Sequence, residues 1–268
     1  MNALPYAADA PASVSQIGIK GRDIENLAAY YKTVLGLDEV TRRTGAIVLG
    51  AGGRPLLEIE EFKAGRPDDP RTAGLYHTAF LLPRRADLAR WAQRAIAERI
   101  PVTGASDHLV SEAIYLDDPE GNGIEIYADR PKDEWQTDDG RLKMGTLPLD
   151  VQNLLGEIKP GDAGWTGAPD NSIVGHVHLR VGNTAEAETW WNETVGFDTM
   201  VNYGGQAVFL STGGYHHHVG ANMWQSRGAG VRDGDRTGLS FVEFRSAAAK
   251  DDREYTDPWG NVIRIVPG

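Results

Sequence analysis

The sequence predicts an α+β protein built from four repeated βαβββ units, of which the fourth is truncated. One observation behind this prediction is that residues 16–40 align without gaps on residues 176–200. Each of these stretches has a short alternating strand, a turn, and then a segment with the period of a helix. A second observation is that residues 74–82 match residues 238–246. Self-similarity of this kind indicates repeated structural units, which we number one to four along the chain.

Units one and three share a helix that follows their first strand. Tyr30–Tyr31 and Trp190–Trp191 occupy aligned positions in it, and each segment closes at a glycine, Gly36 or Gly196, as is typical of a helix C-terminus. We expect the tryptophans here, and Trp224 further on, to pack in the core. Two later strands are expected in each of these units, at residues 45–51 and 54–62 and at residues 206–212 and 215–224.

Units two and four share the turn that precedes their last strand. This turn reads DPEGN at 118–122 and DPWGN at 257–261, and Asp, Pro and Gly favour such a tight reversal. Unit two also has a helix-period segment at 85–99, most of which unit four has lost. The expected division of the chain is a first pair of units, a connector rich in Asp, Gly and Pro, and a second pair, at residues 12–130, 131–170 and 171–268.

The composition excludes several classes of function. The 268 residues carry a net charge of −11, so the chain has no basic surplus with which to bind nucleic acid or an anionic membrane. It contains no cysteine, which rules out disulfides, thiolate catalysis and sulfur-ligated metals. No apolar run approaches the ~20 residues that span a bilayer, and the first residues lack the pattern of a secretory signal. A cytoplasmic location is therefore expected.

One carboxylate needs an explanation. Glu125 lies in "GIEIY", where its neighbours predict a half-buried strand directly after the DPEGN turn. Burying a carboxylate without a partner is costly, so a cation should lie beside it. The residues alone leave open whether that cation is an arginine, a lysine or a metal ion.

The histidines are distributed unevenly along the chain. All seven fall in units two and three, at His77, His108, His176, His178, His216, His217 and His218. Histidines scattered over a surface or a core are not expected to segregate in this way. The segregation favours a common site over seven unrelated roles.

Paired units with a strand–helix start and a DPxGN turn resemble the vicinal oxygen chelate superfamily, which includes glyoxalase I, extradiol dioxygenases and the fosfomycin and bleomycin resistance proteins. The resemblance covers nearly the whole chain outside the connector and the N-terminal dozen residues. It implies two domains with cupped mixed sheets, and metal ligands on the first and last strands of paired units. Those positions carry His77 and Glu125 in unit two and His176 in unit three. In unit four they carry Phe241 and Arg264, which cannot bind a metal.

The resemblance thus implies a metal site between units two and three. Two imidazoles and one carboxylate form the facial triad of non-haem Fe(II) proteins, so Fe(II) is expected, with Mn(II) as the alternative ion. The metal would then be the cation beside Glu125. Unit one would pair with unit four, unless a partner chain in a homo-oligomer supplies the missing half by swapping. The plainer alternative is that His77 and His176 are ordinary strand histidines and that Glu125 pairs with a nearby cation.

The stretch from His108 to Glu125 resembles the signature of extradiol dioxygenases in particular. The pattern is a histidine, five residues, an aliphatic residue and a tyrosine, two more residues, DPEG and a glutamate, and here the tyrosine is Tyr115. The sequence departs from the family at Ser106, where another residue type is usual. The resemblance implies that His108 and Tyr115 hydrogen-bond the oxygens of the substrate.

The run "FLSTGGYHHHVGAN" resembles the strand of these enzymes that carries an acid–base histidine near the O₂ site. The alignment assigns this catalytic role to His217. Strand alternation would then turn His216 and His218 to the opposite face, where they would line the substrate pocket or the surface. His178 shares the face of His176 and is expected to bind substrate, or to replace a ligand if the register slips.

The implied function is that of an extradiol ring-cleaving dioxygenase, which inserts O₂ into a catechol-type aromatic diol. One alternative is a glyoxalase-like lyase or isomerase that uses Zn or Ni. Such sites usually have two carboxylates among four ligands, and Glu125 is the one acid at the aligned positions. The other alternative is a metal-free protein that sequesters an aromatic ligand, which would not need to retain the histidines.

Overall fold

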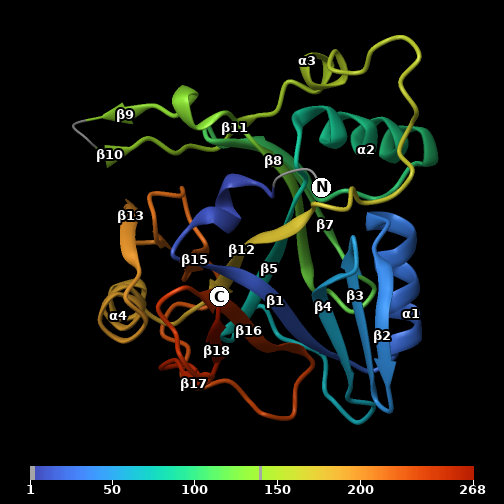
Figure 1. The fold of residues 1–268 in the computed structure, drawn as a ribbon. Coiled ribbons are helices and arrows are strands. Elements are labelled where there is room, and N and C mark those ends of the chain that lie inside the picture. The colour runs from blue at the N-terminus through green and yellow to red at the C-terminus, as the bar shows by residue number, and fades with distance from the viewer. Residues whose placement is uncertain (1–3, 139–140) are drawn as a thin grey trace.

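The fold is built on two mixed β-sheets, as Figure 1 shows for the computed structural model, which describes residues 4–138 and 141–268. The strand order is β17-β18-β16-β1-β4-β3-β2 in the seven-stranded sheet and β11-β6-β7-β8-β5-β12-β15-β14-β13 in the nine-stranded sheet. The α+β fold class that the repeats predict is confirmed by this arrangement.

The strands follow the predicted units closely. Those of the seven-stranded sheet are β1 (Ala12–Gly21), β2 (Asp38–Arg43), β3 (Ala46–Ala51), β4 (Arg54–Glu61), β16 (Gly238–Ser246), β17 (Arg253–Thr256) and β18 (Val262–Pro267). Those of the nine-stranded sheet are β5 (Gly74–Leu81), β6 (Gly104–Asp107), β7 (Ser111–Asp117), β8 (Gly123–Asp129), β11 (Leu147–Pro148), β12 (Ile173–Arg180), β13 (Asp198–Tyr203), β14 (Ala207–Ser211) and β15 (Val219–Asn222).

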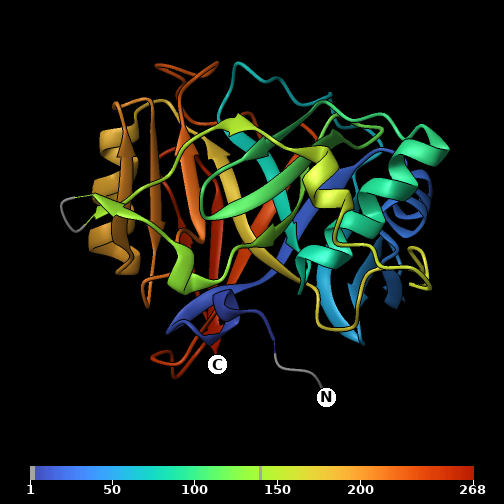
Figure 2. The same cartoon turned by 90° about the horizontal axis from the view of Figure 1, so that it is seen from above.

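The helices lie outside the sheets. They are α1 (Ile24–Tyr30), α2 (Arg85–Glu98), α3 (Val151–Leu155) and α4 (Thr184–Trp190), with short 3-10 turns at Tyr6–Asp9 and Lys132–Glu134. Figures 1 and 2 show α1 and α2 at one end of the molecule and α4 at the opposite end. Among the residues that the structure describes, no helix has both the length and the apolar character needed to cross a membrane.

The two sheets combine the units crosswise. β1 of unit one pairs antiparallel with β16 of unit four, and β5 of unit two pairs antiparallel with β12 of unit three. Each of these central strands also pairs in parallel with the last strand of its own unit, which is β4, β18, β8 or β15. Buried residues of all four units contribute to one large apolar cluster. The first strands of units two and three therefore lie side by side.

The aligned segments of units one and three adopt the same local structure. In each, the α-helix continues into a five-residue π-helical turn, Tyr31–Leu35 or Trp191–Val195. The turn ends at a glycine in the left-handed region, Gly36 with φ 72° or Gly196 with φ 84°, which is favourable because glycine has no Cβ. The predicted repeat of this segment, including its glycine ends, is confirmed.

The DPxGN turn makes the same hydrogen bonds in units two and four. The carboxylate of Asp118 accepts hydrogen bonds from the backbone amides of Glu120 and Asn122 and from the Asn122 side chain. The carboxylate of Asp257 accepts the equivalent set in unit four. Because β8 begins directly after the first of these turns, the turn sets where Glu125 lies in the sheet.

The connector has more structure than its composition predicts. In it β9 (Thr137–Asp138) pairs antiparallel with β10 (Arg141–Leu142), and β11 pairs with β6 at the edge of the nine-stranded sheet. Strands of two residues leave no periodic pattern in a sequence, so alternation could not reveal them. The connector thereby reaches the same sheet that carries the histidines.

Candidate metal centre

Three neighbouring strands, β8, β5 and β12, direct His77, Glu125 and His176 to one face of the sheet. Ala79 of β5 is paired with Glu125 on one side and with His176 on the other. His77 lies two residues before Ala79, so its side chain points to the same face. The register of the sheet therefore brings together one carboxylate and two imidazoles from units two and three. We call these three residues the His–Glu–His group.

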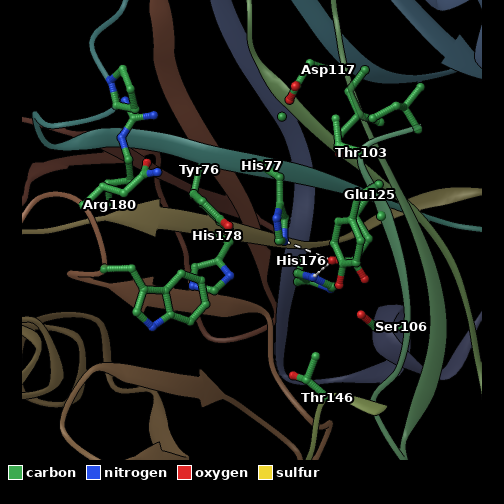
Figure 3. Close-up of a pocket in the computed structure, with 18 of the residues that line it drawn as sticks. Tyr76, His77, Thr103, Ser106, Asp117, Glu125, Thr146, His176, His178 and Arg180 are labelled. Atoms are coloured by element: carbon green, nitrogen blue, oxygen red, sulfur yellow. Dashed lines mark ion pairs between the residues drawn. The ribbon is translucent and has the colours of Figure 1, made fainter. Parts of the chain in front are cut away.

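The side chains of the His–Glu–His group point toward one another (Figure 3). Oε2 of Glu125 lies 3.0 Å from Nε2 of His77 and 3.3 Å from Nε2 of His176. One ligand atom from each residue lies within 4.8 Å of the others, and all three residues are buried. The group forms within a single chain, without a residue from a second copy.

The partners of Glu125 leave its buried charge without a fixed cation. The ion pairs that Glu125 makes within residues 4–138 and 141–268 are with the two histidines. Burial lowers the pKa of His176 to about 4, so this imidazole is neutral at pH 7 and has a lone pair available for a metal. A neutral imidazole does not neutralise a buried carboxylate, whereas a divalent cation would.

The unsatisfied nitrogens of the site fit a metal ion as well. Nε2 of His77 is buried and lies 3.0 Å from Oε2 of Glu125, but this contact does not have the geometry of a hydrogen bond. Leaving a buried polar atom unpaired costs about 1–3 kcal/mol, so such atoms usually mark a missing partner. Two imidazoles with one carboxylate are also the donor set of non-haem Fe(II) sites. The residues present therefore fit a bound metal.

A cavity of about 770 Å³ opens beside the group. His108, Tyr115, His178 and His217 line this cavity together with the His–Glu–His group itself. His178 lies next to His77, with ring centroids 5.0 Å apart, and its Nε2 has no hydrogen-bond partner among the described residues. His178 thus lies in the cavity wall and outside the group of three.

His108 and Tyr115 form a hydrogen-bonded pair. Nδ1 of His108 lies 2.7 Å from the carbonyl oxygen of Gly145, and a carbonyl can only accept, so Nδ1 carries the proton. Nε2 of His108, 2.5 Å from the Tyr115 hydroxyl, therefore accepts a hydrogen bond from it. Burial, with the neighbouring Glu125, raises the pKa of Tyr115 well above its usual range, which keeps the phenol protonated. Gly145 belongs to the connector, whose contribution the sequence did not reveal.

The histidine triplet departs from the expected strand. β15 begins at Val219, so His216, His217 and His218 precede it and do not alternate between two faces. His217 lines the cavity, with its ring centroid 4.1 Å from that of His176, and it contacts His216 directly. The prediction that these three histidines lie in a strand is therefore wrong, because the backbone before β15 is not extended.

His216 and His218 lie behind the cavity rather than in its lining. His216 contacts Asp129, while His218 contacts the hydroxyl of Ser211 at 2.8 Å and the carbonyl of Ala7 at 3.0 Å. Both histidines are fully buried. The predicted substrate-binding role of these two residues is not supported, since neither is among the described residues that line the cavity.

Two aromatic residues that were not predicted to lie in the site complete the cavity wall. Trp224 was expected in the core, but it is 44% exposed and lines the cavity, whereas Trp191 is buried as expected. Tyr76 lies between His77, His178 and Trp224, with ring centroids 5.1–5.3 Å from each. A tryptophan at the end of a strand gives no sequence signal that separates a cavity wall from a core.

Paired βαβββ units with this donor set define a class of proteins. Residues 13–126 match the family model described as Glyoxalase/Bleomycin resistance protein/Dioxygenase superfamily. The chain belongs to this superfamily. It is similar to the catechol-2,3-dioxygenase of Bacillus subtilis (strain 168), with 41% identity over 224 residues that cover 82% of this chain and 78% of that one.

Solved structures share the fold at low sequence identity. The cppA protein from Streptococcus pneumoniae TIGR4 has a TM-score of 0.58 and 10% identity, over 96% of this chain and 99% of its own. Glyoxalase I from Zea mays has a TM-score of 0.55 and 9% identity, over 98% of this chain and 94% of its own. At these identities the likeness shows the fold alone, because one fold hosts several activities.

Proposed function

We propose that this protein is an extradiol ring-cleaving dioxygenase that acts on a catechol-type aromatic diol and O₂. The His–Glu–His group would hold Fe(II), with Mn(II) as the alternative ion. The observation that carries the proposal is the donor set, two imidazole nitrogens and one carboxylate oxygen on one buried face beside a cavity. The 41% identical relative that is named catechol-2,3-dioxygenase supports the reaction class.

The metal and the residues would divide the chemistry between them. Fe(II) bound by the His–Glu–His group would supply Lewis acidity toward the hydroxyls of a diol. The Tyr115 hydroxyl, oriented by His108, would hydrogen-bond a diol oxygen. His217, beside His176, would accept and return a proton as an acid–base catalyst. Trp224 and Tyr76 would pack against the aromatic ring and position it.

The two alternatives make different demands on the site. A glyoxalase-like lyase or isomerase with Zn or Ni usually has two carboxylates among four ligands, whereas the His–Glu–His group contains one. A non-catalytic protein that binds an aromatic ligand needs no buried group of two imidazoles and one carboxylate. The donor set therefore favours the dioxygenase.

The test is anaerobic reconstitution of the metal-free protein with Fe(II), followed by catechol and then air. A yellow ring-fission product that forms with wild type, and not with the His77→Asn variant, is expected. Conversion of methylglyoxal and a thiol in the presence of Ni or Zn would support the lyase instead. Stoichiometric binding of catechol without turnover would support the binding protein. Iron analysis of freshly purified protein distinguishes Fe(II) from Mn(II).

Further predictions accompany the proposed function. We retain the division of the chain into residues 12–130, 131–170 and 171–268, with the metal site between units two and three. A cytoplasmic location also remains a prediction. Analytical ultracentrifugation would test whether the chain forms a homo-oligomer.

A further inference from the structure

A chain of hydrogen bonds runs from His217 in the cavity wall through His216 to the carboxylate of Asp129 at the end of β8. Nδ1 of His217 lies 2.7 Å from Nδ1 of His216. Nε2 of His216 lies 2.9 Å from Oδ1 of Asp129. His216 is fully buried, and the side chain of Asp129 is 16% exposed. The three residues thus form a hydrogen-bonded path from the cavity to a carboxylate that is partly exposed to solvent.

The direction of these hydrogen bonds follows from the chemistry of their atoms. An ionised carboxylate only accepts, so Nε2 of His216 carries a proton and donates it to Asp129. In a neutral imidazole the other nitrogen is then an acceptor, so Nδ1 of His216 accepts from Nδ1–H of His217. The same rule leaves Nε2 of His217 unprotonated. The nitrogen that remains free to act in the cavity is therefore a base.

The surroundings of Asp129 support its role as an acceptor. The hydroxyl of Tyr215 donates a second hydrogen bond to Oδ1 of Asp129, at 3.3 Å. The hydroxyl of Tyr127 in turn lies 2.8 Å from that of Tyr215. Glu125, Tyr127 and Asp129 alternate along β8, so they share one face of the strand. One strand therefore supplies both the carboxylate of the His–Glu–His group and the carboxylate behind His217.

We propose that Asp129, acting through His216, is a positioning residue that holds His217 in the tautomer with an unprotonated Nε2 toward the cavity. This inference rests on the proposed function, because the base is meant for a hydroxyl of the diol. From the sequence, a catalytic role is predicted for His217. The sequence gives no indication that Asp129 or a hydrogen bond from His217 to His216 supports that role.

The arrangement also determines where the charge goes when the base is used. Transfer of a hydroxyl proton breaks the O–H bond of the diol and forms N–H at Nε2 of His217. The Nδ1 proton of His217 can then move to Nδ1 of His216, which leaves His217 neutral. The positive charge now lies on His216 beside the carboxylate of Asp129 and away from the metal ligands. Opposite charges at such short range stabilise each other in a buried site.

The test reads the tautomer directly in metal-free protein labelled with ¹⁵N-histidine. Long-range ¹H–¹⁵N spectra distinguish protonated from unprotonated ring nitrogens, and the His217 signals are assigned by their loss in His217→Gln. Wild type is expected to show protonated Nδ1 and unprotonated Nε2 on His217. Asp129→Ala removes the acceptor, so a substantial fraction of His217 should become protonated at Nε2. A protonated Nε2 in wild type, or an unchanged tautomer in Asp129→Ala, would overturn the inference.

Two further variants separate positioning from folding. Asp129→Asn keeps an oxygen acceptor without the charge, so it should restore the wild-type tautomer. Tyr215→Phe removes the second hydrogen bond to Asp129 and leaves the acceptor of His216 in place, so it should also keep the tautomer. Loss of the tautomer in Tyr215→Phe, with Tm close to that of wild type, would mean that packing rather than Asp129 fixes the ring.

Ring cleavage by the Fe(II)-loaded protein gives a second readout. Asp129→Ala is expected to lower kcat by about 10²-fold, within the range of general acid–base catalysis, with little change in KM. Asp129→Asn should fall between Asp129→Ala and wild type, because it keeps the tautomer and loses the charge. If wild type cleaves no diol, the proposed function fails, and the tautomer of the metal-free protein still decides the inference about Asp129.

Discussion

Glu125 and His176 come from different repeat units, yet their side chains meet across Ala79 with Oε2 and Nε2 3.3 Å apart. These side chains would not meet if unit one paired with unit two and unit three paired with unit four. The antiparallel pairing of β5 with β12 is what closes this distance. The location of the candidate metal centre is thus a consequence of sheet order.

Replacing Glu125 should weaken metal binding strongly without unfolding the protein. Glu125→Gln removes a buried charge that has no fixed cation, so the metal-free protein should be as stable as wild type or more stable. Loss of a charged ligand should weaken Fe(II) or Mn(II) binding by more than about 100-fold, which exceeds the usual effect of outer partners. Isothermal titration under anaerobic conditions measures the affinity, and urea unfolding measures the stability.

Glu112 provides the matched control for that experiment. It is equally buried, but it is paired with Arg85 and Arg130. Glu112→Gln removes one carboxylate partner from each arginine, while Arg85 keeps Glu157 and Arg130 keeps Asp107, so it should cost about 1–2 kcal/mol of stability and leave metal affinity unchanged. Equal metal affinity in Glu125→Gln and Glu112→Gln would contradict the assignment of Glu125 as a ligand.

The two DPxGN turns should separate folding from metal binding. Asp118→Ala and Asp257→Ala each remove a buried acceptor of several hydrogen bonds, so each should cost about 2–4 kcal/mol in unfolding free energy. Only Asp118 precedes the strand that carries Glu125. Metal affinity should fall about 10-fold in Asp118→Ala and stay at the wild-type value in Asp257→Ala. The same loss of affinity in both variants would refute this link.

Trp224 should contribute to substrate binding. Trp224→Ala removes an aromatic wall of the cavity, so KM for the diol should rise about 5- to 10-fold while kcat changes less, in keeping with the ~1 kcal/mol of an aromatic contact. Steady-state kinetics with the Fe(II)-loaded protein measure both constants. Trp190→Ala is the control, because Trp190 packs against the core instead. It should lower Tm and leave KM unchanged.

His218 should make the protein less stable in acid. Burial lowers the pKa of His218 from 6.5 to about 3, so the folded protein keeps this imidazole neutral where the unfolded chain binds a proton. Above pH 6.5 the imidazole of His218 is neutral in both states and does not lower the free energy of unfolding. As pH falls from 6.5 toward 3, the free energy of unfolding decreases by about 1.4 kcal/mol per pH unit, because only the unfolded chain binds the proton. Between pH 7 and pH 5, the free energy of unfolding of His218→Gln should therefore fall by about 2 kcal/mol less than that of wild type.

Urea unfolding of both proteins at the two pH values measures this difference. The other buried histidines remain in the variant, so part of the acid sensitivity should persist. An identical loss of stability in wild type and in His218→Gln would show that His218 is protonated in the folded protein at pH 5.

The fold could be predicted because the sequence repeats the pattern of one βαβββ unit four times, with the fourth copy truncated. The glycine-terminated helices ending at Gly36 and Gly196 and the turns at Asp118 and Asp257 are local patterns, and local patterns depend on few neighbours. The His–Glu–His group could be anticipated from its residue types at aligned strand positions. The helix ends and turns depend on residues within one unit, whereas the group required comparison of aligned positions in units two and three together with the family resemblance.

The remainder of the site depends on contacts between distant segments. Nothing near His108 in the sequence indicates that Gly145 fixes its tautomer, because the two residues lie 37 positions apart and meet only in the folded chain. The strand expected through His216 is not formed, because a turn precedes β15. Asp129 lies near residue 216 only after the sheet has formed. Such partners become visible when tertiary structure is known, since a side chain gives the same sequence signal wherever it points.

The crosswise pairing of units has a consequence for how this chain could be divided. A gene split within the connector would give one fragment with His77 and Glu125 and another with His176. Each fragment would also contain one unit of each sheet, with a hydrophobic edge that only the other fragment covers. Reassembly of the two fragments should therefore be coupled to ion binding, and the protein could serve as a metal-dependent complementation reporter.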